Sequence, residues 1–139
     1  MDLGKLFSIA VLSSLLVGAA QADDVAKGEK TFNRCKACHA ITADDGTNIV
    51  KGGKTGPNLY GVIGRTVGSL DGFTYGDSIA AAGAAGIVWD EEQLAAYVAD
   101  PTDWLEEALG DKSAKSKMTF KLKKGGDHIA AYLATMTPS

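Results

Sequence analysis

Apolar residues recur at helical spacing in several stretches of the chain, and long polar stretches separate them. The first predicted helix runs from Val25 to about Cys38, and its apolar face holds Val25, Gly28, Phe32 and Cys35. A short, alanine-rich helix is predicted from Tyr75 to Ala82. No run of residues alternates convincingly between apolar and polar, so the pattern indicates helices and no substantial sheet.

Three further segments in the second half of the chain favour helix. Asp90 caps a helix whose third position is Gln93, and Pro101 marks its end. An acidic turn or helix is predicted around Thr102 to Leu109. Asp127 is the predicted cap of the last helix, whose apolar stripe consists of Ile129, Tyr132, Leu133 and Met136.

The stretches between these helices are rich in Gly, Lys and Thr, as in "KGGKTGPNLYGVIGRTVG". The predicted fold class is therefore all-α, with about four to five helices joined by long loops. Long loops are unusual in a small domain, and something has to hold them in place.

The N-terminus has the pattern of a secretory signal peptide. A short polar start with Lys5 leads into an apolar run from Leu6 to Ala20, which closes on Ala20-Gln21-Ala22, a small-x-small cleavage pattern. We expect residues 1–22 to be removed after Ala22 and residues 23–139 to form one domain. The mature protein is expected in the periplasm, without stable insertion into the membrane.

Charge is unevenly distributed, although the formal net charge is only −3. No Lys or Arg occurs from Thr66 to Asp111, whereas six lysines and no acidic residue occur from Lys112 to Lys124. Such a separation gives the molecule a dipole that the net charge conceals.

The only two cysteines stand in "CKACH", residues 35–39. A thioredoxin-like dithiol is expected at the start of a helix in an α/β fold, but Cys35 and Cys38 fall at the end of a predicted helix. A zinc site needs four ligands, or three and a water, and beyond His39 only His128 remains.

Covalent attachment of haem is the third interpretation of this motif, and the one that we favour. The two thiols of Cys35 and Cys38 add to the vinyl groups of the porphyrin, and His39 reaches the iron as proximal ligand. Export agrees with this interpretation, because c-type haem is attached outside the cytoplasm. A buried porphyrin also supplies the apolar surface that long loops need.

The second axial ligand has several candidates: Met118, Met136, His128 or none. Met136 belongs to an apolar stripe and His128 stands next to a predicted helix cap, so core packing and solvation are their ordinary roles. Met118 stands in the polar stretch "SAKSKMTFKLKK", where an isolated thioether is best explained by the iron. His/Met ligation raises the reduction potential and leaves no open coordination site.

The chain resembles the class I c-type cytochromes, and most of all bacterial cytochrome c2. The resemblance rests on blocks in a fixed order: "GEKTFNRCKACH", "KTGPNLYGVIGRT", "GFTY", "WDEEQLAAYVADP", "KMTFKL" and "IAAYL". It implies the class I cytochrome c fold around one covalently bound haem c. It also implies that Gly28 and Phe32 cross the last helix near Ile129 and Tyr132.

The resemblance also implies roles around the haem. The carbonyl of Pro57 accepts a hydrogen bond from His39 Nδ1–H. Arg65, Tyr75 and Trp89 match positions that hold the haem propionates, and Tyr97 matches a hydroxyl near the methionine sulfur.

The implied function is one-electron transfer and not enzymatic catalysis. Electrons would pass from the cytochrome bc complex to a photosynthetic reaction centre or a terminal cytochrome oxidase, and the protein would act as a monomer without nucleic-acid partners. The alternative is a haem domain that binds a small ligand or reduces peroxide at an open sixth site.

A lysine-rich surface at the haem edge is expected to dock on acidic partners. Its lysines are Lys36, Lys51, Lys54, Lys115, Lys117, Lys121, Lys123 and Lys124. The acidic residues between Asp90 and Asp111 are expected mostly on another face.

Overall fold

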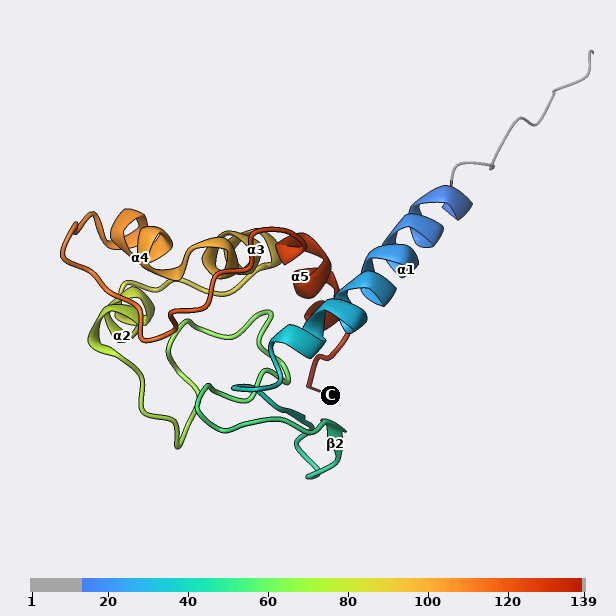
Figure 1. The fold of residues 1–139 in the computed structure, drawn as a ribbon, viewed down its shortest axis with the longest axis horizontal. Coiled ribbons are helices and arrows are strands. Elements are labelled where there is room, and N and C mark those ends of the chain that lie inside the picture. Colours follow the sequence, from blue (N-terminus) through green and yellow to red (C-terminus); the bar gives the residue numbers. More distant parts are fainter. Residues whose placement is uncertain (1–13, 139) are drawn as a thin grey trace, which may run out of the picture.

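The computed structural model describes the backbone of residues 14–138 and the side chains from residue 20 onward. The prediction of a signal peptide at residues 1–22 therefore falls mostly outside the described part: its polar start is not described, and of its apolar run only the side chain of Ala20 is described. Five α-helices dominate the described part: α1 (Ser14–Thr31), α2 (Asp77–Ala84), α3 (Glu91–Ala99), α4 (Pro101–Leu109) and α5 (Gly126–Ala134) (Figure 1). The predicted all-α class is confirmed.

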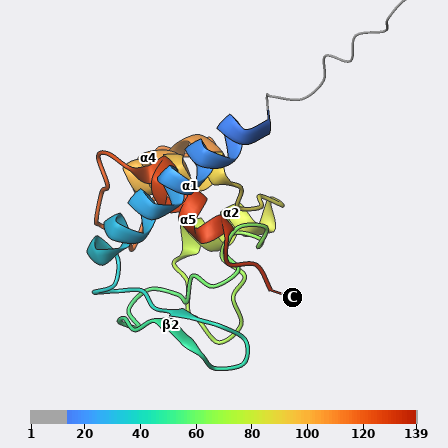
Figure 2. The same cartoon turned by 90° about the vertical axis from the view of Figure 1, so that its right-hand side faces the viewer.

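The only strands among the described residues form a small hairpin. Strand β1 (Ile41–Thr42) pairs antiparallel with β2 (Asn48–Val50), and Ile41 lies opposite Val50. Figures 1 and 2 show the helices gathered on one side of the molecule, with the hairpin and the loops that follow it on the other. No helix in the described part is long and apolar enough to cross a membrane.

The first helix ends earlier than the sequence pattern predicts. Helix α1 stops at Thr31, and the 3₁₀ helix η1 (Phe32–Arg34) follows it. The carbonyl of Phe32 accepts hydrogen bonds from both Cys35 N (2.8 Å) and Lys36 N (3.2 Å), so the chain tightens into short turns there. Cys35 and Cys38 therefore lie on turns beyond the helix and not on its apolar stripe.

The last helix begins differently from the prediction. Gly125, with φ of 91°, is the residue before the first turn of α5, and no side-chain cap is present, so the prediction of Asp127 as the cap was wrong. A left-handed backbone at this point favours glycine over aspartate. Met136 lies beyond Ala134, the last residue of α5, and so does not belong to the stripe of the helix itself. Helix α2 is shifted by two residues from the predicted Tyr75–Ala82.

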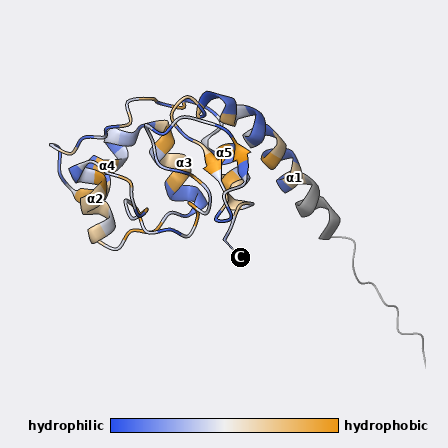
Figure 3. Ribbon diagram, turned by 90° about the horizontal axis from the view of Figure 1, so that it is seen from below, coloured by the Kyte–Doolittle hydropathy of each residue, from blue (hydrophilic) through white to orange (hydrophobic). Residues whose placement is uncertain are grey.

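Helices α1 and α5 cross closely, as the resemblance implied. Gly28 lies against α5 so tightly that a Cβ there would stand 2.6 Å from Tyr132 Cβ and would also collide with the carbonyl of His128. The rings of Phe32 and Tyr132 pack with centroids 5.9 Å apart. Figure 2 shows α1 crossing in front of α5, and in Figure 3 α5 is among the most hydrophobic segments. The predicted crossing is confirmed.

Helices α3 and α4 meet at a sharp bend. Asp90 caps α3 by accepting a hydrogen bond from Gln93 N at 2.7 Å, as predicted. Asp100 caps α4 by accepting one from Asp103 N at 3.2 Å. Pro101 is the first residue of α4, a position where its missing N–H costs nothing. The segment predicted as an acidic turn or helix is thus a helix.

Candidate haem site

The CKACH segment forms a compact turn. His39 N donates to the carbonyl of Cys35 at 3.0 Å, which closes the turn. Cys35 is half-buried and Cys38 is exposed. Burial raises the pKa of the Cys35 thiol. A redox-active dithiol is expected at the start of a helix, whereas these two cysteines follow the end of α1 and η1, so the structure disfavours the thioredoxin-like interpretation.

His39 is held in one tautomer. Its Nδ1 lies 2.8 Å from the carbonyl oxygen of Pro57, and because a carbonyl can only accept, Nδ1 carries the proton. Burial lowers the pKa of His39, and the hydrogen bond to Pro57 opposes that shift. The imidazole is therefore neutral and keeps its Nε2 lone pair for a metal ion.

Glycines that the sequence analysis did not single out position this imidazole. A Cβ on Gly56 would stand 2.6 Å from His39 Nδ1, so only glycine lets the chain lie flat against the ring. Gly53 N donates to the carbonyl of Lys36 (2.9 Å), and Gly56 N donates to that of Cys38 (2.8 Å). The signal for this contact was the "KGGKTG" stretch, whose glycines lie against the CKACH turn.

Arg65 and Tyr75, which match positions that hold the haem propionates in similar proteins, make hydrogen bonds to the backbone of nearby loops. The Arg65 guanidinium donates to the carbonyls of Asn58 (3.1 Å) and Tyr60 (2.6 Å). Burial lowers the pKa of Arg65, while Tyr75 acts to raise it. The hydroxyl of Tyr75 accepts a hydrogen bond from Leu70 N at 3.1 Å.

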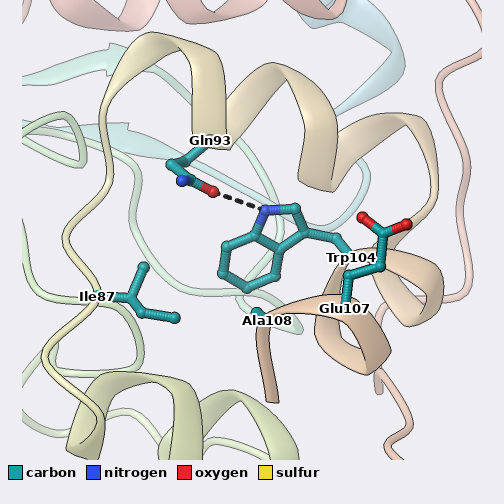
Figure 4. Close-up of a pocket in the computed structure, with 5 residues that line it drawn as sticks. All are labelled: Ile87, Gln93, Trp104, Glu107 and Ala108. Carbon is teal, nitrogen blue, oxygen red and sulfur yellow. Dashed lines mark hydrogen bonds between the residues drawn. The ribbon is translucent and has the colours of Figure 1, made fainter. Parts of the chain in front are cut away.

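Trp89 and Tyr97 belong to a buried aromatic cluster with Trp104. The ring centroids of Trp89 and Tyr97 are 5.0 Å apart, and those of Trp89 and Trp104 are 5.1 Å apart. Trp104 Nε1 donates to Gln93 Oε1 at 2.9 Å, beside a surface pocket of about 290 Å³ (Figure 4). The sequence analysis missed Trp104, which joins α4 to α3 through its bond to Gln93 and packs against the ring of Tyr97.

Met118 lies half-buried in the long loop between α4 and α5 and packs against the core. Its backbone N–H donates to Ser116 Oγ at 3.0 Å, and that oxygen lies 3.3 Å from the hydroxyl of Tyr97. The guanidinium carbon of Arg34 stands 5.2 Å from the ring centre of Phe120. This contact brings the loop of Met118 beside the CKACH turn.

The other candidate axial ligands lie elsewhere. His128 Nε2 is 3.4 Å from Asp24 Oδ1, so its ring lies at the α1–α5 contact. Met136 is partly buried, and its carbonyl accepts a hydrogen bond from Gly61 N at 2.9 Å. Within residues 14–138, no three His, Cys, Asp or Glu side chains form a group that could hold a metal ion.

The donor set fits a covalently attached haem. Two thiols, one neutral imidazole with an available Nε2 and one half-buried thioether are the groups that such a cofactor needs. Together with the helices and loops described above, they define the class of protein: a c-type cytochrome with the class I fold, which carries one haem c.

Comparison with known proteins narrows the class. The chain is 57% identical over 132 residues to cytochrome c2 of Rhodobacter capsulatus, covering 95% of this chain and 96% of that protein. It is 55% identical over 140 residues to cytochrome c-550 of Paracoccus versutus, covering 99% and 91% of the two chains. The solved structure of the Rhodobacter capsulatus cytochrome c2 superposes with a TM-score of 0.80 and 62% identity, covering 81% of this chain and 97% of that one.

No family model matches the chain. The sequence identities of 57% and 55% over nearly the full length nevertheless establish the family: the chain belongs to the cytochromes c2 and c-550. It is an electron carrier and not an enzyme.

Proposed function

We propose that the protein is a periplasmic one-electron carrier that takes electrons from a cytochrome bc complex and delivers them to a photosynthetic reaction centre or a terminal oxidase. The observation that carries the proposal is the hydrogen bond from His39 Nδ1 to the Pro57 carbonyl, next to the two thiols of Cys35 and Cys38. A neutral imidazole fixed in this way has Nε2 free to bind iron, which supports His39 as the proximal ligand.

Each site residue has a role in this proposal. Cys35 and Cys38 hold the haem by thioether bonds, and His39 and Met118 are its axial ligands. The haem supplies a reversible one-electron couple. Arg65, Tyr75 and Trp89 stabilise the propionate side, where Arg65 already lies half-buried. Tyr97 acts on the methionine side through Ser116.

Export is part of the same proposal. Residues 1–22 are a signal peptide, and residues 23–139 are the mature cytochrome domain. Ala20, Gln21 and Ala22 are all exposed, which supports access to the cleavage site. The first turns of α1 project beyond the body of the molecule (Figure 1), so their removal leaves the α1–α5 contact at Gly28 in place.

The docking surface consists of lysines on both sides of the haem edge. Lys36, Lys51 and Lys54 are exposed on the CKACH turn and the loop after it, and Lys115, Lys117, Lys123 and Lys124 are exposed in the loop of Met118. Lys121 differs, because it pairs with Asp100 at 2.7 Å. Seven exposed lysines remain available to attract acidic partners.

Mass spectrometry of the native protein tests attachment and export together. We expect a chain that begins at Asp23 with one haem added, and a mass that survives acid–acetone extraction, which removes non-covalent haem. Cys35→Ser with Cys38→Ser should abolish the added mass. Haem released by the extraction from the unaltered protein would contradict thioether attachment.

The alternative of an open sixth site makes a different prediction. An electron carrier with Met118 on the iron binds no carbon monoxide at neutral pH, whereas a ligand-binding haem domain binds it readily. Carbon monoxide titration of the reduced protein therefore separates the two functions.

A further inference from the structure

The loop that carries Met118 has no regular secondary structure, yet it is attached at defined points. It connects α4, which ends at Leu109, with α5, which begins at Gly126. A loop of this length cannot place a side chain by itself, because its conformational freedom is large. Its attachments therefore decide where the thioether of Met118 lies.

Three of these attachments flank Met118, one before it and two after it, and all three lead to the bend between α3 and α4, which we call the elbow (residues 98–102). Before Met118, Ser116 N donates to Thr102 Oγ1 at 3.1 Å. After Met118, Lys121 Nζ pairs with Asp100 Oδ2 at 2.7 Å. Leu122 N donates to the carbonyl of Val98 at 2.8 Å.

The elbow makes its three contacts with different kinds of group: the backbone carbonyl of Val98, the carboxylate of Asp100 and the hydroxyl of Thr102. Asp100, whose backbone is extended with φ of −155° and ψ of 94°, separates the last residue of α3 from the first residue of α4. Its Oδ2 binds Lys121, while its Oδ1 caps α4 through Asp103 N.

Of the three contacts of the elbow, the one made by Thr102 is connected to Met118 through the fewest bonds. Thr102 fixes the backbone of Ser116, and Ser116 Oγ accepts the Met118 N–H at 3.0 Å. The same oxygen lies 3.3 Å from the Tyr97 hydroxyl. Loss of the Thr102 hydroxyl would leave the half-buried Ser116 N–H without its acceptor and would release the segment that holds Met118.

We propose that Thr102 is a positioning residue for the axial methionine: its hydroxyl oxygen, as the N-terminal anchor of the loop on the elbow, keeps Met118 at the iron. The inference rests on the proposed role of Met118 as axial ligand. Thr102 itself touches neither the iron nor the haem in this scheme.

The test measures how readily the methionine leaves the iron. Imidazole is titrated into the oxidised holoprotein, since it binds only when Met118 has dissociated. In Thr102→Val, which keeps the branched shape but lacks the hydroxyl, we expect imidazole to bind about 5- to 30-fold more tightly. The absorption band of the methionine–iron bond should weaken in parallel, and Thr102→Ser, which restores the hydroxyl, should behave as the unaltered protein does.

Thr135→Val is the matched control. It removes a hydroxyl that donates to the Tyr132 carbonyl at 2.6 Å, near the end of α5. It should lower the urea midpoint of unfolding without changing the affinity for imidazole. If Thr102→Val behaves in that same way, Thr102 is only a stabilising residue and the inference is wrong.

Further outcomes distinguish a failure of the role inferred for Thr102 from a failure of the assignment of Met118 as axial ligand. If Met118→Ala opens the iron to imidazole while Thr102→Val binds as tightly as the unaltered protein, only the inference fails. If Met118→Ala changes nothing, the assignment of Met118 fails, and the inference with it. Equal effects of Thr102→Val and Thr102→Ser would exclude the hydroxyl as the cause. Should Thr102→Val not fold, Thr102→Ala replaces it, and failure of both would overturn the inference.

Discussion

A few atoms around His39 decide how the imidazole is presented. The Pro57 carbonyl fixes the proton on Nδ1, and Gly56 leaves room for the ring to lie flat against the chain. Burial keeps the ring neutral by lowering the pKa of His39. The carbonyl and the glycine belong to residues 18 and 17 positions further along the chain, so the site depends on how the loop returns to the CKACH turn.

Met118 should be the thioether that binds the iron. Met118→Ala should keep the haem attached, open the sixth site to carbon monoxide and lower the reduction potential by on the order of 0.1 V, part of the roughly 0.8 V range that axial ligands control. Redox titration and carbon monoxide binding measure these effects. Met136→Ala is the control, because Met136 packs beyond α5; if it causes the changes in place of Met118→Ala, the wrong sulfur has been assigned.

Between elements, the closest contact is the crossing of α1 and α5 at Gly28. Gly28→Ala should gain about 1 kcal/mol of helix propensity but lose more through the clash with the His128 carbonyl and Tyr132, for a net destabilisation of about 1–3 kcal/mol. Urea unfolding of the holoprotein measures the free energy of unfolding.

Glu29→Ala, an exposed substitution on the same helix, should change the stability by less than about 0.5 kcal/mol. A Gly28→Ala variant more stable than the unaltered protein would mean that the two helices separate at little cost.

The elbow should lose an attachment in acid. Lys121 and the N–H of Asp103 lower the pKa of Asp100 below its ordinary value of 3.8. A carboxyl with a lowered pKa adds stability that is fully present above its unfolded pKa and is lost as pH falls through the folded pKa. Asp100→Asn should therefore reduce the stability at pH 7 and flatten its decline below about pH 4.

Thermal unfolding between pH 2 and pH 7 measures this dependence. Asp71→Asn, which removes an exposed carboxyl from a loop outside the elbow, is the control and should leave the decline almost unchanged. An unaltered decline in Asp100→Asn would show that the pair with Lys121 adds nothing measurable, as is common for exposed ion pairs.

For the whole molecule, charge is separated along the chain but not completely in space. The sequence predicted that the acidic residues between 90 and 111 lie mostly apart from the lysines that follow. Two of them do not: Asp100 pairs with Lys121 at 2.7 Å, and Glu106 pairs with Lys112 at 3.2 Å. Lys121 is therefore partly neutralised, and the proposed docking surface rests on the other lysines.

Electron transfer to an acidic redox partner should slow as salt is added. Screening acts over a Debye length of about 10 Å at 0.1 M salt, so the second-order rate should fall steeply up to that concentration. Lys54→Glu or Lys117→Glu should lower the rate at low salt by about tenfold. Stopped-flow kinetics against ionic strength measures both effects.

Glu92→Lys, on the exposed surface of α3, is a charge reversal of the same size and opposite sign away from the lysines, and it should change the rate far less. Asp100→Lys is unsuitable, because it would break the pair with Lys121. A rate that stays constant or rises with salt would contradict docking through the lysines.

Local patterns predicted much of this molecule. Helical spacing of apolar residues predicted about the right number of helices. Asp90 and Gln93 predicted the start of α3, because a helix cap is an interaction between residues close in sequence. The cap at Asp127 was wrong, since the left-handed backbone of Gly125 sets the start of α5. Gly56, Ser116 and Trp104 were missed, because each acts on a partner far from it in sequence or through a turn that the pattern does not encode.

By itself, the sequence determined the chemistry: two thiols and an imidazole in CKACH, a polar loop with one methionine, and the order of blocks that places the chain among the cytochromes c2 and c-550. Only the tertiary structure decided the geometry. It placed the Pro57 carbonyl on His39 Nδ1, Gly28 against α5, and the loop of Met118 on the elbow. Residue types fix which bonds are possible, whereas contacts between distant segments exist only after the chain has folded.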